Sequence, residues 1–468
     1  MARRLRVLAV SLLVVVGVSG VQPSVPASHS VPDPTVSGPV GTAGLRGHAL
    51  WDSWFDLAAY GYEEDEYFVS GNATNATSGA TAPYTTRIIV TRPADPDDFN
   101  GTVLLDWVNV TAQFENAVDS LEAQEYLLRD GWALVHVSAQ SAGICCNPLT
   151  PKVWDPVRYA TLSHPGDAFA YSMFSQVAKA VKSPTGVDPL DGLPGARYLV
   201  AAGQSQSASR LDTYVRNAQA DADVIDGFLI HGGGSKAYTA PPAAPVLHLL
   251  SDAEAAVAAP THDGDNYRLW EVAGSAHADF WIGYQQEFGQ GPRTLADAPQ
   301  QSQADREAIT ATAGNYGEQP HPMHGTCILA GTAFPMRYSV SAALDHVKAW
   351  VRPDGPVPPA GPRFAFSGTT LARDTDGNAL GGIRLAPIDV PVARYVSTTC
   401  GLGGITVPFT EAELLLRYPT HAAYYGAVAA RVADNVADGY LLPEDAADLL
   451  ARACDAKNRW GDLSGSDC

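Results

Sequence analysis

The sequence predicts an α/β fold around a mostly parallel sheet, and three observations support this class. Strand-like runs alternate with helix-like runs over residues 46–352, as expected when crossover helices connect parallel strands. Several strand-like runs are almost continuously apolar, which is typical of strands covered by helices on both faces. The 468-residue chain is 46% hydrophobic and 17% charged, so it can bury a sizeable core.

The expected elements follow in order along the chain. The candidate strands span residues 86–91, 102–108, 133–138, 197–202, 225–231, 246–250 and 267–272. The candidate helices span residues 120–130, 167–181, 206–218 and 340–351. Beyond a Pro-rich bridge at 353–362, amphipathic helices are expected near 411–417, 421–437 and 443–455. We therefore expect a core at 46–352 and a C-terminal extension at 353–468 packed on it.

The N-terminal residues have the composition of a secretory signal. Arg3, Arg4 and Arg6 precede an apolar run at 7–18, and small residues at 25–27 offer a cleavage site. A membrane anchor needs about 20 apolar residues, and Ser19 and other polar residues interrupt this stretch too early. We predict a signal peptide at 1–27, a linker at 28–45, and a secreted or extracytoplasmic protein without stable membrane insertion after cleavage.

The acidic balance and the cysteines limit the functional classes. With 50 Asp and Glu against 30 Lys and Arg, the formal net charge is -20, which disfavours a nucleic-acid partner. Six cysteines in an exported chain favour disulfides, and we expect at least two, with a Cys145–Cys146 bridge among the possibilities. None has the spacing of a zinc site, so we predict no metal and no cofactor. The oligomeric state stays open.

The most informative motif is Gly203-Gln-Ser-Gln-Ser207. It follows the candidate strand 197–202 and opens the candidate helix 206–218, which is the strand–turn–helix context of a nucleophile elbow. There a strained turn exposes the serine above the sheet, and small residues two before and two after it allow close packing. Gly203 keeps the first small position and Ser207 replaces the second glycine. We predict that Ser205 is a nucleophile; otherwise it only caps the helix.

A serine nucleophile needs a base oriented by an acid, in the chain order Ser, acid, His. His277 follows the last core strand in a glycine-containing loop and is the predicted base. His321 and His324 are weaker candidates because no predicted strand positions them. The acid is Asp252 or Glu254, both in the turn after strand 246–250. The distance from the strand-opening proline favours Glu254.

An oxyanion hole needs backbone N–H donors near the serine. The candidates are Gln206, next to the nucleophile, and the turn at Asn109 and Val110 that ends an early strand. His231-Gly-Gly-Gly234 looks like an oxyanion loop, but it follows the serine in sequence instead of preceding it, so we interpret it as a turn.

A long insertion follows His277. Residues 281–326 are rich in Gln, Gly and Pro, have little periodicity, and exceed the usual length of a connection in α/β units. Because the insertion begins beside His277, we expect a lid-like segment over the site. Trp281, Tyr284 and Phe288 either form its apolar wall or anchor it to the core.

The sequence resembles a known group, the α/β-hydrolase superfamily. Within that superfamily it resembles the bacterial and fungal alpha/beta hydrolase domain family. The matching stretches are 99–111, 137–143, 203–207, 273–277 and 377–384, which span most of the chain. The resemblance implies an α/β-hydrolase fold. The family pattern has Glu then Asp where this chain has Asp252 then Glu254, so the resemblance leaves the acid open.

The resemblance also implies a secreted serine hydrolase that acts on small-molecule esters, as a carboxylesterase does through an acyl-enzyme. It implies no particular substrate. Two alternatives remain open at the sequence level: a catalytically silent exported binding protein on the same scaffold, and a serine peptidase. An aspartate-nucleophile dehalogenase is disfavoured because the elbow carries Ser205.

Overall fold

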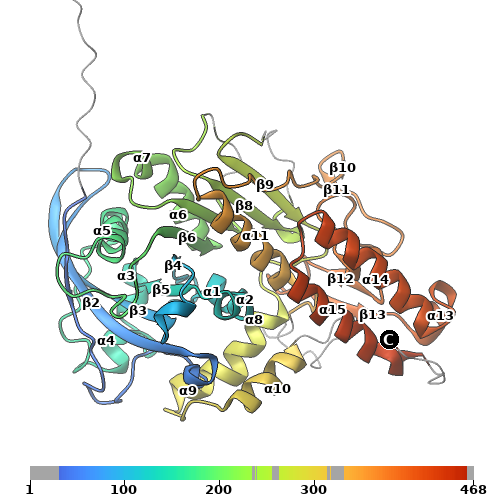
Figure 1. Cartoon of the computed structure of the whole chain (residues 1–468), viewed down its shortest axis with the longest axis horizontal. Coiled ribbons are helices and arrows are strands. Elements are labelled where there is room, and N and C mark those ends of the chain that lie inside the picture. The colour runs from blue at the N-terminus through green and yellow to red at the C-terminus, as the bar shows by residue number, and fades with distance from the viewer. Residues whose placement is uncertain are drawn as a thin grey trace, which may run out of the picture.

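The computed structural model describes residues 31–234, 238, 240–255, 263–313, 317, 331–460 and 468. Their main feature is one sheet of order β1-β2-β3-β5-β4-β6-β7-β8-β9 (Figure 1). Its strands are β1 (Thr35–Ser37), β2 (Tyr62–Thr74), β3 (Thr81–Pro93), β4 (Thr102–Trp107), β5 (Ala133–Val137), β6 (Tyr198–Gln204), β7 (Gly227–His231), β8 (Val246–Ser251) and β9 (Tyr267–Val272). From β5 to β9 all neighbours pair in parallel, whereas β1, β2 and β3 add an antiparallel edge.

All seven predicted strands overlap observed ones, but β1 and β2 were not predicted. β2 contains four consecutive acidic residues, which is unfavourable in an isolated strand. The fold compensates for them at long range. Glu66 is buried and receives hydrogen bonds from Arg87 of β3 at 2.9 Å and from Arg158 at 2.6 Å. Pairing partners distant in the sequence therefore determine this strand.

Helices cover both faces of the sheet. One face carries α5 (Ala170–Lys182) and α6 (Gln206–Asn217), and the other carries α1 (Val118–Glu122), α2 (Gln124–Arg129) and α11 (Met336–Trp350). Each face has its own cluster of buried apolar side chains. Along β4, for example, Leu104 belongs to one cluster while Val103 and Leu105 belong to the other. This arrangement accounts for the continuous apolar runs in the sequence.

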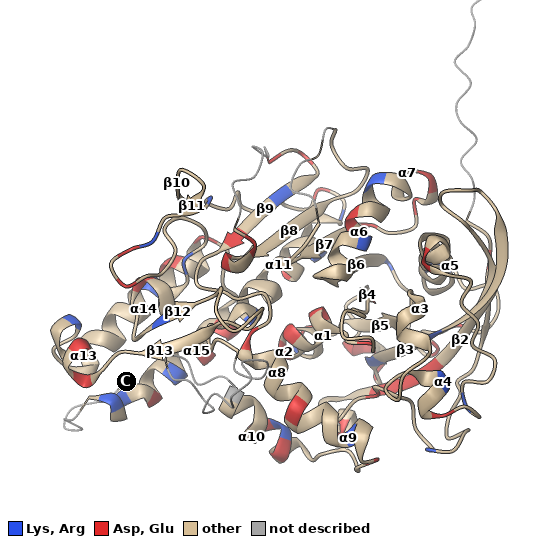
Figure 2. Ribbon diagram, turned by 180° about the vertical axis from the view of Figure 1, so that it is seen from behind, with Lys and Arg blue, Asp and Glu red and all other residues tan. Residues whose placement is uncertain are grey.

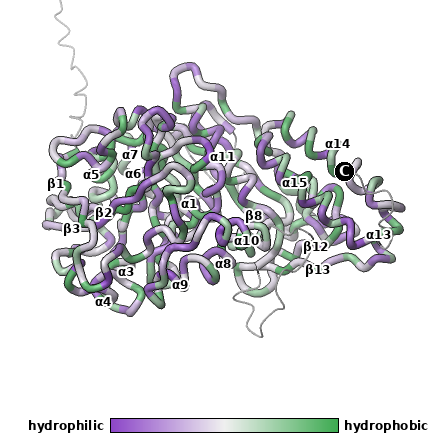
Figure 3. Tube along the Cα trace, turned by 60° about the horizontal axis from the view of Figure 1, so that its bottom comes forward, coloured by the Kyte–Doolittle hydropathy of each residue, from purple (hydrophilic) through white to green (hydrophobic). Residues whose placement is uncertain are grey.

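The C-terminal residues share a core with the sheet. The predicted helices appear as α13 (Glu411–Arg417), α14 (His421–Ala437) and α15 (Pro443–Asp455), and Figure 3 shows hydrophobic residues interleaved with hydrophilic ones along α14 and α15. Val428 and Leu449 belong to the same apolar cluster as Trp270 of β9. Residues before and after 352 therefore share one apolar cluster. The boundary proposed at residue 352 stays a prediction.

Smaller elements complete the described chain. The C-terminal part has two hairpins, β10 (Phe366–Ser367) with β11 (Thr370–Leu371) and β12 (Ala393–Val396) with β13 (Ile405–Pro408), and a short α12 (Ala386–Asp389). The remaining short helices are α3 (Ser141–Ile144), α4 (Pro151–Trp154), α7 (Gln219–Ala222), η1 (Leu57–Tyr60), η2 (Pro96–Asp98), η3 (Asp167–Phe169), η4 (Asp252–Glu254) and η6 (Ala456–Arg459).

The segment after His277 is more regular than its sequence indicates. It forms α8 (Phe280–Gln285), a π-helical turn η5 (Gln286–Gln290), α9 (Gly291–Leu295) and α10 (Gln303–Ala313). The sequence shows little periodicity here because glycines and a proline interrupt the apolar pattern, although each short helix still forms. That the segment acts as a lid stays a prediction. In Figure 1 these yellow helices lie below the carboxyl edge of the central strands.

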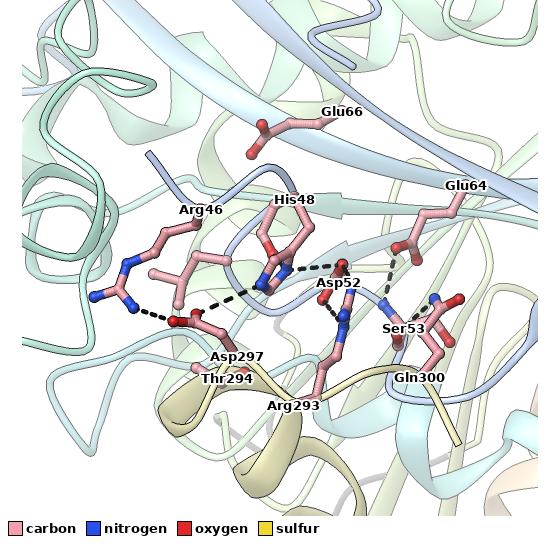
Figure 4. A network of polar contacts seen from close by, with 12 residues as sticks. Arg46, His48, Asp52, Ser53, Glu64, Glu66, Arg293, Thr294, Asp297 and Gln300 are labelled. Atoms are coloured by element: carbon pink, nitrogen blue, oxygen red, sulfur yellow. Dashed lines mark hydrogen bonds and ion pairs between the residues drawn. The ribbon is translucent and has the colours of Figure 1, made fainter. Parts of the chain in front are cut away.

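Polar contacts tie α9 to the N-terminal segment 46–53 (Figure 4). Arg293 donates two hydrogen bonds to Asp52, at 2.7 Å and 3.2 Å. Asp297 lies between Arg46 and His48, accepting from the Arg46 guanidinium and lying 3.7 Å from His48 Nε2. Two segments far apart in sequence are thus fixed side by side by charged groups.

Disulfides join Cys145 to Cys146 and Cys454 to Cys468, and Cys400 is also disulfide-bonded. No helix within the described residues is long and apolar enough to span a bilayer. The predicted signal peptide at 1–27 lies outside the described residues, as do His321 and His324. Acidic residues are spread over many elements, including α7, α10 and α13 (Figure 2).

Candidate active site

Ser205 lies in the turn between β6 and α6 with φ 63° and ψ -117°, a backbone conformation that costs a non-glycine residue energy. A Cβ at Gly203 would lie 3.1 Å from backbone atoms of Ser207, so close packing requires the glycine. Ser207 is tolerated in place of the second glycine because its buried hydroxyl donates to the Gln204 carbonyl at 2.8 Å. The local geometry is that of a nucleophile elbow.

His277 lies in the loop after β9, with its Nε2 2.8 Å from Ser205 Oγ. The Gln204 side chain donates to the His277 carbonyl at 2.8 Å, which holds the loop beside the elbow. This contribution of Gln204 could not be predicted from the sequence, since a glutamine inside the motif carries no signal of its own. The imidazole can accept the serine proton in this arrangement.

Glu254 is the carboxylate that contacts the imidazole, with Oε1 2.5 Å from His277 Nδ1. Its other oxygen accepts the Ser251 N–H at 2.7 Å, and Ser251 Oγ in turn accepts the N–H of Ala253. Burial acts to raise the pKa of Glu254, but the contact with His277 and the hydrogen bonds from Ser251 outweigh it and hold the pKa at about 2. The carboxylate is therefore fixed and charged at neutral pH.

Asp252 has a different partner. It is buried, and its carboxylate forms an ion pair with Arg373 of the C-terminal extension at 3.3 Å. Burial raises the pKa of Asp252 and Arg373 opposes the rise only in part. The structure thus brings Glu254, and not Asp252, together with His277.

The three candidate oxyanion donors differ in whether their backbone N–H groups already form a hydrogen bond. Gln206 is the first residue of α6, where an N–H has no acceptor within the helix. For Val110, too, no hydrogen bond from the N–H is formed within the described residues. The prediction that Asn109 is an oxyanion donor was wrong. Its backbone N–H already donates to the Asn116 carbonyl at 2.8 Å, so it cannot donate to an oxyanion. Its side-chain amide instead donates to the Gln204 carbonyl at 2.9 Å, joining the two loops.

The glycine turn after β7 packs against the elbow. A Cβ at Gly233 would lie 2.4 Å from the Ser205 carbonyl oxygen. His231 is buried and its Nδ1 lies 2.9 Å from Asp119 Oδ1. These contacts fit the interpretation of 231–234 as a turn.

A cleft of about 900 Å³ opens beside Ser205 and His277. Ile282 of α8 and Leu295 of α9 line it, whereas Trp281, Tyr284 and Phe288 do not.

The three aromatic side chains of this segment pack against the protein instead. Trp281 is buried, its indole N–H donates to the Leu121 carbonyl at 3.3 Å, and the Arg337 guanidinium lies over its ring. The rings of Tyr284 and Phe288 pack against each other, tilted by 38° and with centres 4.4 Å apart. Of the two roles considered for these aromatics, the contacts therefore favour anchoring.

A pair of buried acids lies behind the histidine loop. Asp279 caps α8 by accepting the Ile282 N–H at 3.2 Å. Burial raises the pKa of Asp279 to about 6, and burial together with Asp279 raises the pKa of Glu122. Each of these carboxyls therefore binds its proton more tightly than an exposed carboxyl does. Within the part of the chain that the structure describes, no group of acidic, His or Cys side chains has the arrangement of a metal site.

The sequence matches the family described as Alpha/beta hydrolase domain over residues 34–451, so the chain belongs to that family. The comparison with curated proteins gives no match. Three solved structures are similar over part of their length. Esterase Est22 is 12% identical over 42% of this chain and 67% of its own, with a TM-score of 0.26.

A putative dienelactone hydrolase from Klebsiella pneumoniae subsp. pneumoniae is 12% identical over 52% of this chain and 95% of its own, with a TM-score of 0.24. A putative acetyl xylan esterase from Bacteroides fragilis is 10% identical over 47% and 63%, with a TM-score of 0.24. The family match identifies the fold as that of an α/β hydrolase, as expected. The resemblance stated from the sequence is thereby confirmed.

Proposed function

We propose that the protein is a serine hydrolase that cleaves carboxylic esters through a Ser205–His277–Glu254 triad. The observation that carries the proposal is the continuous line of contacts from Ser205 Oγ to His277 Nε2 at 2.8 Å and from His277 Nδ1 to Glu254 at 2.5 Å. Membership of the hydrolase family supports the same assignment.

In this mechanism Ser205 Oγ attacks the ester carbonyl carbon while His277 Nε2 takes the hydroxyl proton. Glu254 holds the imidazole by Nδ1 and stabilises its cation. The N–H groups of Gln206 and Val110 donate to the oxyanion of the tetrahedral intermediate. His277 then protonates the leaving alcohol, and water, activated by the same imidazole, hydrolyses the acyl-enzyme and regenerates Ser205.

Export is part of the proposal. The basic and apolar character of residues 1–27 favours a signal peptide. Disulfides such as Cys145–Cys146 and Cys454–Cys468 form and persist in oxidising compartments.

The test is labelling of the purified mature protein with a fluorophosphonate probe, together with hydrolysis of short aryl esters. We expect the label on Ser205, and we expect Ser205→Ala to lose both labelling and turnover. The matched control is Thr213→Ala, which removes a hydroxyl from the same helix α6 at a position that lines neither space beside Ser205. A wild-type protein that takes up no label and hydrolyses no ester favours the silent binding protein, and turnover confined to peptides favours the peptidase.

A further inference from the structure

Ser205 lies between two spaces of opposite chemical character. The cleft on the His277 side is lined by large apolar side chains, among them Trp51, Phe114, Ile282, Leu295 and Leu402. On the other side of the serine lies an open hollow of about 710 Å³. Its lining includes the polar side chains Gln140, Asp167, Ser209 and Arg210. A substrate that occupies both spaces must itself have one apolar end and one polar end.

The apolar cleft is completed by the C-terminal extension. The turn 400–403 reaches the histidine loop, where the Ala278 N–H donates to the Leu402 carbonyl at 3.1 Å. The same turn is held from its other side, because the Thr332 N–H donates to the Gly403 carbonyl at 2.7 Å. The Leu402 side chain lines the cleft and yet is 57% exposed, and Leu295 of α9 is 66% exposed. Exposed leucines that line a cleft offer contact to an apolar ligand.

The polar hollow contains a guanidinium with unused donors. Arg210 lies on α6, one and a half turns beyond Ser205, and its Nη2 donates to Asp167 at 3.3 Å. Asp167 is held in place by Ser141 and Gln140, whose hydrogen bonds to it are 2.8 to 3.1 Å long. Within the described residues this is the one hydrogen bond that Arg210 makes, so most of its five donors remain for oxygen acceptors of a ligand.

The proton path determines which end of the ester enters which space. The leaving oxygen must come within hydrogen-bond distance of His277 Nε2 to be protonated. His277 lines the cleft and not the hollow, whereas Gln206 and Val110 line the hollow and not the cleft. The alcohol side of the ester therefore extends into the apolar cleft, and the acyl side extends past the oxyanion donors toward Arg210.

Building on the hydrolase function proposed above, we propose that the substrates are esters of a bulky apolar alcohol with a short, polar acyl group. Leu402 of the C-terminal extension selects the alcohol, and Arg210 selects an acyl group that carries an oxygen acceptor such as a carboxylate. The reaction stays ester hydrolysis: the bond between the carbonyl carbon and the alcohol oxygen breaks, the acyl group passes to Ser205 and then to water, and the alcohol leaves with the proton from His277.

Two matched ester pairs test the proposal through kcat/KM. Ethyl and 2-naphthyl acetate differ in the alcohol, and 2-naphthyl pentanoate and 2-naphthyl hydrogen succinate differ in the acyl group at similar length. We expect the wild-type protein to prefer the naphthyl ester in the first pair and the succinate in the second. A methylene-sized or hydrogen-bonding difference at such a pocket changes kcat/KM about tenfold or more.

The variants are Leu402→Gln and Arg210→Met. We expect Leu402→Gln to lower the naphthyl-to-ethyl ratio about tenfold, with the succinate-to-pentanoate ratio retained, and Arg210→Met to do the reverse. Arg210→Lys should retain part of the acyl preference. The control is Leu416→Gln, a leucine of the same extension that is 86% exposed on α13 and does not line the cleft.

Some outcomes overturn the inference. If Leu402→Gln changes the acyl ratio and Arg210→Met the alcohol ratio, the two ends have been assigned the wrong way round. If neither ratio moves in variants that melt like the wild type, neither residue selects substrate. Failure of the hydrolase proposal has a different signature, because then no ester turns over and the fluorophosphonate probe does not label Ser205.

Discussion

The residues proposed for chemistry and the residues that wall the cleft are held in place differently. Ser205, Glu254 and His277 lie in turns that follow β6, β8 and β9, strands of one sheet between two apolar clusters. The cleft is lined by segments 46–53, 282–295 and 400–403. Ion pairs join the first two segments, and hydrogen bonds join the third to the histidine loop and to Thr332. The two large apolar clusters on the faces of the sheet fix the first group, whereas the second group has smaller apolar clusters and depends also on directional hydrogen bonds and ion pairs. Chemistry and selectivity should therefore respond to different mutations.

The largest expected effect is on the acid. Glu254→Gln removes the charge that stabilises the imidazolium, and we expect kcat to fall about 1,000-fold or more. Asp252→Asn should lower kcat far less, because its partner is Arg373 and not His277. Steady-state kinetics of both variants at pH 7.5 gives the ranking, and a larger loss in Asp252→Asn would reassign the role.

A smaller effect is expected where the oxyanion loop joins the elbow. Asn109→Ala removes the hydrogen bond to the Gln204 carbonyl, so the neighbouring Val110 N–H is less well positioned, and we expect kcat to fall about 10- to 100-fold with little change in KM. Asn100→Ala is the matched control at the opposite end of β4, where the amide donates to the Asp130 carbonyl. It should lower the melting temperature and leave kcat unchanged; equal losses of kcat in both variants would contradict the assignment.

Weakening the attachment of α9, which lines the cleft, should change substrate selectivity and leave the reaction at Ser205 intact. Arg293→Met removes two hydrogen bonds to Asp52, a local loss of about 2 kcal/mol, and frees α9 from segment 46–53. We expect KM for naphthyl acetate to rise about fivefold, while the rate of fluorophosphonate labelling stays that of the wild type. Arg129→Met, which breaks a pair with Asp445 away from the cleft, is the control. A loss of labelling in Arg293→Met would show that the segments lining the cleft also control the reactivity of Ser205.

The smallest expected effect is on stability and its pH dependence. The pKa of Asp279 is raised from 3.8 to about 6, so the folded state binds a proton more tightly than the unfolded state, and this contribution to stability is lost as the pH rises from about 4 through 6. Glu122→Gln removes a second buried acid, whose own pKa is raised by burial and by Asp279, so the decline should become shallower and the free energy of unfolding at pH 8 should rise by about 1 to 2 kcal/mol. Urea denaturation between pH 4.5 and 8 measures it. A variant curve parallel to that of the wild type would show that Glu122 contributes nothing to the decline.

The same division between core and periphery explains what could be predicted from sequence. The elbow was recognisable because strand, turn and helix are contiguous. β9 was predicted with its observed bounds because Leu269, Trp270 and Val272 give it a mainly apolar pattern. β2 and the helices α8–α10 were missed, since their stability depends on partners such as Arg87 and Asp52 that lie elsewhere in the chain. Local sequence favoured Glu254 over Asp252 only through its distance from the strand-opening proline, because the partner that pairs with Asp252, Arg373, lies 121 residues further on.

That the cleft is lined by three separate segments, 46–53, 282–295 and 400–403, also has an evolutionary consequence. Each of its segments is a loop or short helix at the periphery, and such segments accept insertions and substitutions more readily than the strands that carry a core. A change in 46–53, 282–295 or 400–403 would reshape the cleft while the strained turn at Ser205 and its packing against Gly233 stay as they are. We therefore expect divergence within this family to be concentrated in these three stretches, so that one inherited reaction centre comes to serve different substrates.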